Sequence, residues 1–324
     1  MPTLIFEKQH YQRNLEETVL DCLLRHGVSV PHSCRSGVCQ SCLMRSIDSD
    51  PPAAAQHGLK DSLRQQRYFL ACACAPEGDI AATLSGPVLI RLPARVISVE
   101  KLSRRIARVR LDPAGDFDYR AGQFLNLARG DGLTRPYSIA SLPYTEDFLE
   151  LHVARHEQGR MSSWIHDELQ PGDELAVSTP LGECCYRPEH PQQPLLLVGT
   201  GCGLAPLYGV IRDALHHGHT GPIWLYHGSR DREGLYLVEE LRGLARAHDN
   251  FNYVPCLDSP AAGEADFTLQ RAHEAALARH TDMKGWRVFL CGHPEMVKQT
   301  KKKTYLAGAA LADIHADPFH LATG

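Results

Sequence analysis

Four cysteines near the N-terminus have the residue type and the spacing to bind iron. Cys34, Cys39 and Cys42 form the arrangement C-x4-C-x2-C, and Cys72 follows after twenty-nine intervening residues. Three thiolates on one tight loop and a fourth from a later segment can surround the two irons of a 2Fe-2S cluster. Structural zinc usually takes paired C-x2-C knuckles, which this triplet fits poorly. The spacing therefore predicts a 2Fe-2S cluster.

The fourth ligand position has a second candidate. Cys74 lies two residues after Cys72 in the segment Phe-Leu-Ala-Cys-Ala-Cys. We assign Cys72 because it follows Leu-Ala, as in plant-type ferredoxins, which this pattern resembles. Several other cysteines are expected to be small buried side chains, namely Cys22, Cys184, Cys185 and Cys256.

A small α+β unit is expected to hold the cysteine loop. The pattern predicts a strand over residues 3–7 and a helix over about 18–26 that ends at Gly27, a suitable C-cap. The composition changes at Ser85-Gly86-Pro87, so this unit should end near residue 88.

A second motif, Arg135-Pro-Tyr-Ser138, lies among short, regularly spaced strands. Alone, this tetrapeptide is more typical of an ordinary strand with an exposed arginine. The spacing predicts a small barrel that ends near residues 188–191. Its expected strands cover residues 94–99, 106–111, 123–127, 135–140 and 148–153.

A third motif, Gly159-Arg-Met-Ser162, opens a predicted helix that has Met161, Ile165 and Leu169 on one face. The free N–H groups and the positive end of a helix can bind a pyrophosphate. For Ser162, a plain N-cap is the alternative.

The C-terminal part alternates strands with helices, which predicts a parallel sheet covered on both faces. Gly199-Thr-Gly-Cys-Gly-Leu-Ala-Pro206 follows an apolar strand and precedes a helix, the context of a dinucleotide-phosphate loop. The expected strands cover 195–198, 223–227, 251–256 and 287–291, and the helices 207–217, 235–248 and 268–280.

Together these motifs resemble, over nearly the whole chain, the ferredoxin–flavin–nicotinamide reductases that serve bacterial oxygenases. The resemblance implies a multidomain protein with an α+β (β-grasp) ferredoxin domain, an all-β flavin-binding barrel and an α/β nicotinamide-binding domain with a parallel sheet. The expected boundaries are 1–88, 89–190 and 191–324. One departure is Gln40, where the family usually has glycine.

The resemblance also implies a flavin site. Arg135 should neutralise the FAD pyrophosphate with its fixed charge, Tyr137 should pack on the isoalloxazine, and the Ser138 hydroxyl should hydrogen-bond flavin N5, the hydride acceptor. Gly159 and Ser162 should bind the pyrophosphate at the start of their helix.

The nicotinamide site is implied in the same way. The backbone of Gly199, Thr200, Gly201 and Gly203 should approach the coenzyme phosphates. Cys291-Gly-His-Pro-Glu-Met296 resembles the family's C-G-x-P-x-M element, in which the cysteine and Gly292 lie beside the nicotinamide. Hydride transfer needs no nucleophile, so we expect Cys291 to position the coenzyme.

The sequence leaves two contacts undecided, one with the coenzyme and one with the flavin. Asp231 can hold a ribose 2′-OH, which favours NADH, whereas Arg230 can pair with the 2′-phosphate of NADPH. The resemblance favours NADH. In the closing segment Asp313-Ile-His-Ala-Asp-Pro-Phe319, either Phe319 covers the flavin or it lies in a frayed tail.

The composition narrows the partners. The formal net charge of −4 and scattered basic residues make nucleic acid an unexpected partner. Apolar runs such as Leu195–Val198 are far shorter than a membrane span. The N-terminus lacks an apolar signal core, so we expect a cytoplasmic protein with reduced thiols.

The sequence thus predicts an NAD(P)H-dependent oxidoreductase: hydride passes to FAD, and single electrons leave through the 2Fe-2S cluster to a terminal oxygenase or another electron-accepting protein. Two alternatives remain. The chain can serve a deoxysugar dehydratase complex, or it can be a non-catalytic electron carrier or redox sensor. Intact Arg135, Tyr137, Ser138 and the Gly199 loop argue against the second alternative.

Overall fold

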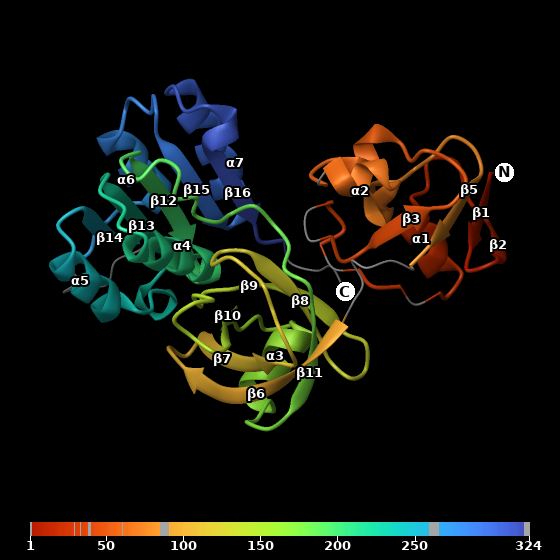
Figure 1. The fold of residues 1–324 in the computed structure, drawn as a ribbon, viewed down its shortest axis with the longest axis horizontal. Helices are drawn as coiled ribbons and strands as arrows, with labels where there is room; N and C mark the ends of the chain where they lie inside the picture. Colours follow the sequence, from red (N-terminus) through yellow and green to blue (C-terminus); the bar gives the residue numbers. More distant parts are fainter. Residues whose placement is uncertain are drawn as a thin grey trace.

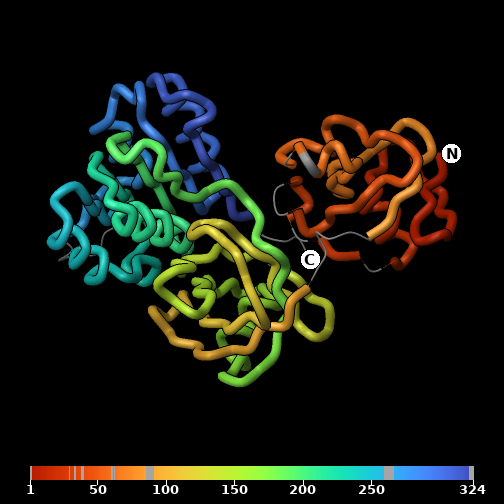
Figure 2. The backbone as a smooth tube through the Cα atoms, in the orientation of Figure 1, coloured from red at the N-terminus to blue at the C-terminus, as the bar shows by residue number. Residues whose placement is uncertain are grey.

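A computed structural model describes residues 2–28, 30–32, 34–37, 40–59, 61–84, 91–258 and 266–320. The chain forms three lobes that follow one another in sequence order, as Figures 1 and 2 show. Each lobe is built on one sheet, of five, six and five strands respectively. We call them the N-terminal unit, the barrel and the C-terminal unit.

The N-terminal unit is a mixed sheet with a helix packed against it. The sheet has the order β2-β1-β5-β3-β4, with β1 and β5 parallel and the other pairs antiparallel. The Thr18 side chain accepts a hydrogen bond from Asp21 N–H and so caps the helix α1. The elements are β1 (Thr3–Phe6), β2 (Gln9–Gln12), α1 (Val19–Arg25), β3 (Leu43–Ser46), α2 (Asp61–Gln65), β4 (Tyr68–Leu70) and β5 (Ile80–Thr83).

This unit has a hydrophobic core of its own. The buried cluster contains Leu4, Leu20, Met44 and Phe69, and all its members lie before residue 85. The linker expected at Ser85-Gly86-Pro87 lies outside the described residues.

The barrel is an antiparallel sheet with the order β10-β7-β6-β11-β8-β9. A bridge between Ile139, just after β9, and Leu151 in β10 joins the two ends of this sheet and closes it. The helix α3 buries Met161 and Ile165 against the closed sheet. The elements are β6 (Arg91–Lys101), β7 (Ile106–Pro113), β8 (Phe124–Ala128), β9 (Thr134–Ser138), β10 (Leu149–Ala154), α3 (Arg160–Asp167) and β11 (Glu174–Ser178).

The C-terminal unit is a parallel sheet between two layers of helices. The strand order is β14-β13-β12-β15-β16, and every pair is parallel. Leu195 and Leu197 pack on one side with α4 and α5, whereas Leu196 and Val198 pack on the other with α6 and α7. The elements are β12 (Leu195–Thr200), α4 (Leu204–His216), β13 (Ile223–Ser229), α5 (Val238–Ala247), β14 (Phe251–Leu257), α6 (Ala272–Arg279), β15 (Arg287–Gly292), α7 (Pro294–Leu306) and β16 (Ile314–Pro318).

These sheets confirm the predicted α+β, all-β and α/β classes. The connection from the barrel is part of the third core, because Cys184 and Tyr186 pack beside Leu195 and Leu207. None of the helices in the described ranges is long and apolar enough to cross a membrane.

Candidate functional site

Cys34 and Cys42 of the cysteine loop lie near Cys72, a third predicted ligand. Cys72, in a short 3-10 turn after β4, contacts the Cys42 thiol and the backbone N–H of Gly37, and both contacts lower the pKa of its thiol. Cys34 is also near enough to influence that pKa, and its sulfur accepts a hydrogen bond from Ser36 N–H at 3.4 Å. Backbone N–H groups that face sulfur are what a cluster of thiolate ligands requires.

The fourth predicted ligand, Cys39, lies outside the described residues. Within the described part of the chain, no three histidine, cysteine or acidic side chains are grouped closely enough to hold a metal ion by themselves. Cys74, the alternative to Cys72, is fully buried in the core of the N-terminal unit, where burial raises the pKa of its thiol to about 12. The geometry therefore sets Cys74 apart from the other cysteines of the loop.

Gln40 occupies a conformation that favours glycine. Its φ is +54°, in the left-handed region. The loop therefore keeps the backbone turn that a glycine would give, although a side chain is present. Among the residues that the structure describes, the Gln40 side-chain amide donates only to the carbonyl of Gly58, at 3.5 Å.

The edge strand β9 presents the Arg135–Ser138 motif. Burial raises the pKa of Tyr137, and the guanidinium of Arg135 is close enough to oppose that shift. The Ser138 side chain is 6% exposed, and within the described residues its hydroxyl makes no hydrogen bond. A nearly buried hydroxyl without a protein partner fits the role of a donor to a bound flavin.

The start of α3 is a tight turn around Gly159. A Cβ at this glycine would lie 2.4 Å from the Ser162 hydroxyl oxygen. That hydroxyl donates to the Gly159 carbonyl and accepts from His156 N–H, both at 3.2 Å. Ser162 therefore braces the turn with its side chain, and the first N–H groups of the helix are the ones left to bind a pyrophosphate.

The glycine loop after β12 locks against the end of β15. A Cβ at Gly203 would lie 2.3 Å from the Cys291 carbonyl oxygen, and a Cβ at Gly292 would lie 2.5 Å from the Thr200 hydroxyl. The same hydroxyl accepts a hydrogen bond from His293 N–H at 2.9 Å. The two nicotinamide motifs therefore form one surface at the carboxyl ends of parallel strands, where such sheets bind nucleotides.

A buried histidine of the neighbouring strand β13 hydrogen-bonds the glycine loop. His227 Nε2 lies 3.2 Å from the carbonyl oxygen of Gly201, which has φ +53°. His227 is fully buried, and burial lowers its pKa to about 4, so the neutral ring donates this bond at pH 7. Sequence reasoning missed His227, although it ends the apolar strand that precedes the predicted ribose contact.

The Cys291 thiol is packed in the protein interior and is not placed to act as a nucleophile. Its side chain is fully buried and its sulfur lies 3.4 Å from that of Cys184. Burial holds the pKa of the Cys291 thiol well above its ordinary value, so almost no reactive thiolate forms.

The predicted ribose contact is already in an ion pair. Both Asp231 carboxylate oxygens face Arg105, at 3.2 and 3.0 Å. Arg105 belongs to the β6–β7 hairpin of the barrel, and Ser103 of that hairpin donates to the Glu233 carbonyl at 2.9 Å. Arg230 is exposed. The barrel therefore helps to orient the segment that follows β13.

The C-terminal strand brings Phe319 to the nicotinamide surface. β16 pairs with β15, and Phe319 N–H donates to the Gly292 carbonyl at 2.7 Å. The Phe319 side chain is half-buried. This residue is held by the sheet, in contrast to a frayed tail.

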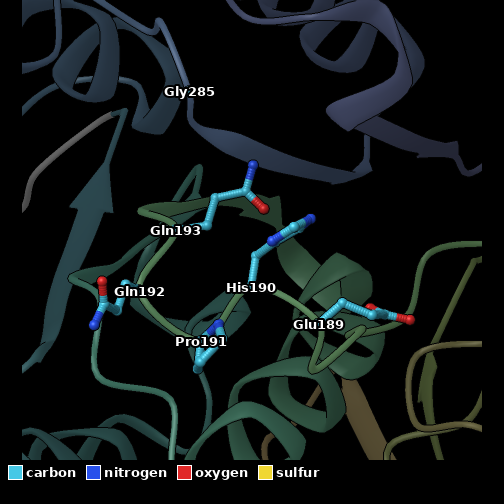
Figure 3. Close-up of a pocket in the computed structure, with 6 residues that line it drawn as sticks. All are labelled: Glu189, His190, Pro191, Gln192, Gln193 and Gly285. Atoms are coloured by element: carbon cyan, nitrogen blue, oxygen red, sulfur yellow. The ribbon is translucent and has the colours of Figure 1, made fainter.

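The flavin and nicotinamide surfaces meet. Cys202, in the glycine loop, lies near enough to Tyr137 of β9 to influence its pKa. The pocket in Figure 3 is a different feature. It is lined by Gln192, Gln193 and Gly285, which precede β12 and β15, so it lies at the opposite edge of the sheet from the glycine loop.

Comparison with known proteins identifies each unit. Residues 6–77 match the 2Fe-2S iron-sulfur cluster binding domain, residues 93–186 the oxidoreductase FAD-binding domain, and residues 197–302 the oxidoreductase NAD-binding domain. The chain therefore has domains for all three predicted cofactors.

Relatives share the whole arrangement. The chain is 32% identical over 311 residues to the naphthalene 1,2-dioxygenase system ferredoxin–NAD(P)(+) reductase component of Pseudomonas putida, covering 93% of each. It is 30% identical to the phenol hydroxylase P5 protein of Acinetobacter pittii, covering 94% of this chain and 90% of that one.

A solved structure extends the likeness to three dimensions. The Amycolatopsis cytochrome P450 reductase GcoB matches with a TM-score of 0.70 and 28% identity, over 98% of this chain and 99% of that one. The chain therefore belongs to the three-domain reductases that form the reductase components of oxygenase systems, and it is an NAD(P)H-dependent oxidoreductase that carries electrons toward an oxygenase through FAD and a 2Fe-2S cluster.

Proposed function

We propose that Arg135, Tyr137 and Ser138 form the flavin site and that the Gly199–Gly203 loop with Cys291 and Gly292 forms the nicotinamide site. The observation that carries this proposal is the close packing of α4, which follows the glycine loop, on the segment after the flavin motif: a Cβ at Gly209 would lie 3.2 Å from the Ala140 carbonyl oxygen. When bound, NAD(P)H supplies a hydride, FAD accepts it, and the 2Fe-2S cluster carries single electrons onward.

The side chains of the barrel orient and neutralise the flavin. Arg135 supplies a fixed positive charge for the pyrophosphate, and the N–H groups at the start of α3 also stabilise its negative charge. Tyr137 gives a flat apolar surface for the ring system. Ser138 donates its free hydroxyl toward the atom that receives the hydride, and this bond strengthens as negative charge develops there.

The C-terminal unit presents the coenzyme to that surface. Gly203 and Gly292 allow the glycine loop to pack directly against the end of β15, so that both motifs face the coenzyme from one surface, and His227 fixes the Gly201 carbonyl. Cys291, neutral and buried, fills space beside the ring and keeps water out. Half-buried Phe319, whose N–H bonds the Gly292 carbonyl, would cover a bound flavin.

The electron exit is assigned to the N-terminal unit. Cys34, Cys39, Cys42 and Cys72 hold the cluster, and the acceptor is a terminal oxygenase; neither nucleic acid nor a membrane is a partner. The oxygenase partners named for the relatives support this choice over a deoxysugar dehydratase. We place the domain boundaries near residues 88 and 190 and the protein in the cytoplasm, where its many cysteines stay reduced.

An absorption spectrum followed by anaerobic addition of NADH tests this function. The purified holoprotein should show flavin and iron–sulfur bands, and NADH should bleach both in turn. A flavin band that bleaches while the iron–sulfur band does not would refute the assigned exit. A spectrum without flavin would refute the flavin site.

A further inference from the structure

A buried hydrogen bond joins the cysteine loop to the barrel. The Ser41 hydroxyl donates to the side-chain carbonyl oxygen of Asn126 at 2.7 Å. Ser41 is 5% exposed and Asn126 is 8% exposed, so both groups are almost fully removed from water. A buried polar group that loses its partner is strongly penalised, so this pair favours one orientation of the N-terminal unit.

Ser41 connects directly to the cluster ligands. It immediately precedes Cys42, whose thiol contacts Cys72. The core of the N-terminal unit contains only residues of that unit, so the contact with Asn126 is not needed to complete it. The bond therefore serves the placement of the loop relative to the barrel.

Asn126 connects directly to the flavin strand. It lies in β8, where its N–H donates to the Ser178 hydroxyl at 2.9 Å, and its cross-strand neighbour in β9 is Pro136. Ser138 lies two residues beyond Pro136, so its side chain is on the same face of the sheet. Asn126 and Ser138 are therefore diagonal neighbours, with backbones about 7–8 Å apart. In Figure 1 the N-terminal unit lies next to the side of the barrel that carries β8.

We propose that Ser41 and Asn126 are positioning residues that hold the cysteine loop against the flavin-bearing face of the barrel, so that electrons pass between the two cofactors within one chain. This inference rests on the proposed function, because it assigns the flavin to β9 and the cluster to the cysteine loop. Electron transfer slows as two centres separate. The bond therefore controls how fast the cluster is reduced, and it leaves the capture of hydride alone.

The test uses the full-length holoprotein and two single variants, Ser41→Ala and Asn126→Ala. Tyr144→Phe is the matched control, since the Tyr144 hydroxyl also bonds across two units but joins the barrel to Asp213 of α4 in the C-terminal unit. After rapid mixing with NADH, both test variants should reduce the cluster about fivefold to tenfold more slowly than the native chain, the range expected from one lost hydrogen bond. The control should reduce it at the native rate, and iron content should be equal in all four proteins.

Hydrogen–deuterium exchange on the oxidised proteins gives a readout that does not depend on turnover. Exchange at residues 40–46 and 124–128 should rise in both test variants and stay native in Tyr144→Phe. Native exchange in both variants, or a native rate of cluster reduction in both, would overturn the proposal. If NADH failed to reduce the flavin of the native chain, the proposed function would fail, while exchange would still decide whether the contact exists.

Discussion

Ser138 combines near-complete burial with a hydroxyl that no described residue binds, which leaves that hydroxyl available to a bound flavin. Ser138→Ala should therefore leave FAD bound, because affinity rests on Arg135 and the start of α3, while flavin reduction slows by about 10². Stopped-flow reduction at saturating NADH measures the rate, and flavin content measures binding. An unchanged rate would show that Ser138 is only a strand residue.

Gln40 holds a left-handed backbone that favours glycine. Gln40→Gly should stabilise the cysteine loop by about 1 kcal/mol, because glycine adopts this φ without steric penalty. Bleaching of the iron–sulfur band in increasing urea measures the effect, and its midpoint should rise. Gln40→Ala is the control, since it removes the side chain and keeps the penalty. An equal rise in both variants would point to the side chain instead.

The functional motifs can be predicted from the sequence, but the residues that support them cannot. Cysteine spacing and the Arg135–Ser138 tetrapeptide were recognisable because their chemistry dictates residue type and order. His227, Ser41 and Asn126 were not, because a single polar residue in an apolar strand or a loop has many uses. Their roles come from contacts such as Ser41 with Asn126, which lie 85 positions apart in the chain.

Among the elements, the β6–β7 hairpin bears on coenzyme choice. Arg105 holds the Asp231 carboxylate beside the predicted ribose site. A fixed carboxylate binds ribose hydroxyls and repels a 2′-phosphate, so we predict a higher kcat/KM for NADH than for NADPH. Asp231→Asn should raise kcat/KM for NADPH and so reduce the difference in kcat/KM between the two coenzymes.

Steady-state kinetics with both coenzymes, for the native chain and Asp231→Asn, decide the point. Glu233→Gln is the control, because it removes a nearby charge whose side chain is exposed. A native preference for NADPH would mean that Arg230 governs recognition and that Asp231 serves only its ion pair.

Strands with alternating or continuous apolar residues were predicted close to their observed bounds. Three elements of the barrel and the C-terminal unit were missed, and so were five short elements of the N-terminal unit, namely β2, β3, α2, β4 and β5. β16 contains His315, Asp317 and Pro318, which are poor strand residues, and only pairing with β15 makes it a strand. α7 begins at Pro294 and contains Lys301–Lys303. Because most of its residues are polar, its apolar face is not evident from the sequence. β11 is short and lies between β6 and β8, and its place follows from closure of the barrel.

For the whole molecule, the cores predict which parts fold alone. The N-terminal unit has a separate core, while Ile106 of the barrel and Cys184 of the connection share the core of the C-terminal unit. A fragment of residues 87–324 should therefore fold, bind FAD and reduce ferricyanide with NAD(P)H. It should lose cytochrome c reduction. Flavin content and both rates are measured against the full chain, and an insoluble or flavin-free fragment would refute this modularity.

The order of electron flow is the central claim, and one variant of the full chain tests it most directly. Cys34→Ser removes a cluster ligand in the N-terminal unit and leaves the flavin and nicotinamide surfaces untouched, so hydride capture should continue. We measure NADH-dependent reduction of ferricyanide and of cytochrome c by the same preparation. We predict native ferricyanide reduction and loss of cytochrome c reduction. Full retention of cytochrome c reduction would contradict this prediction, because the flavin itself would then be the exit for single electrons.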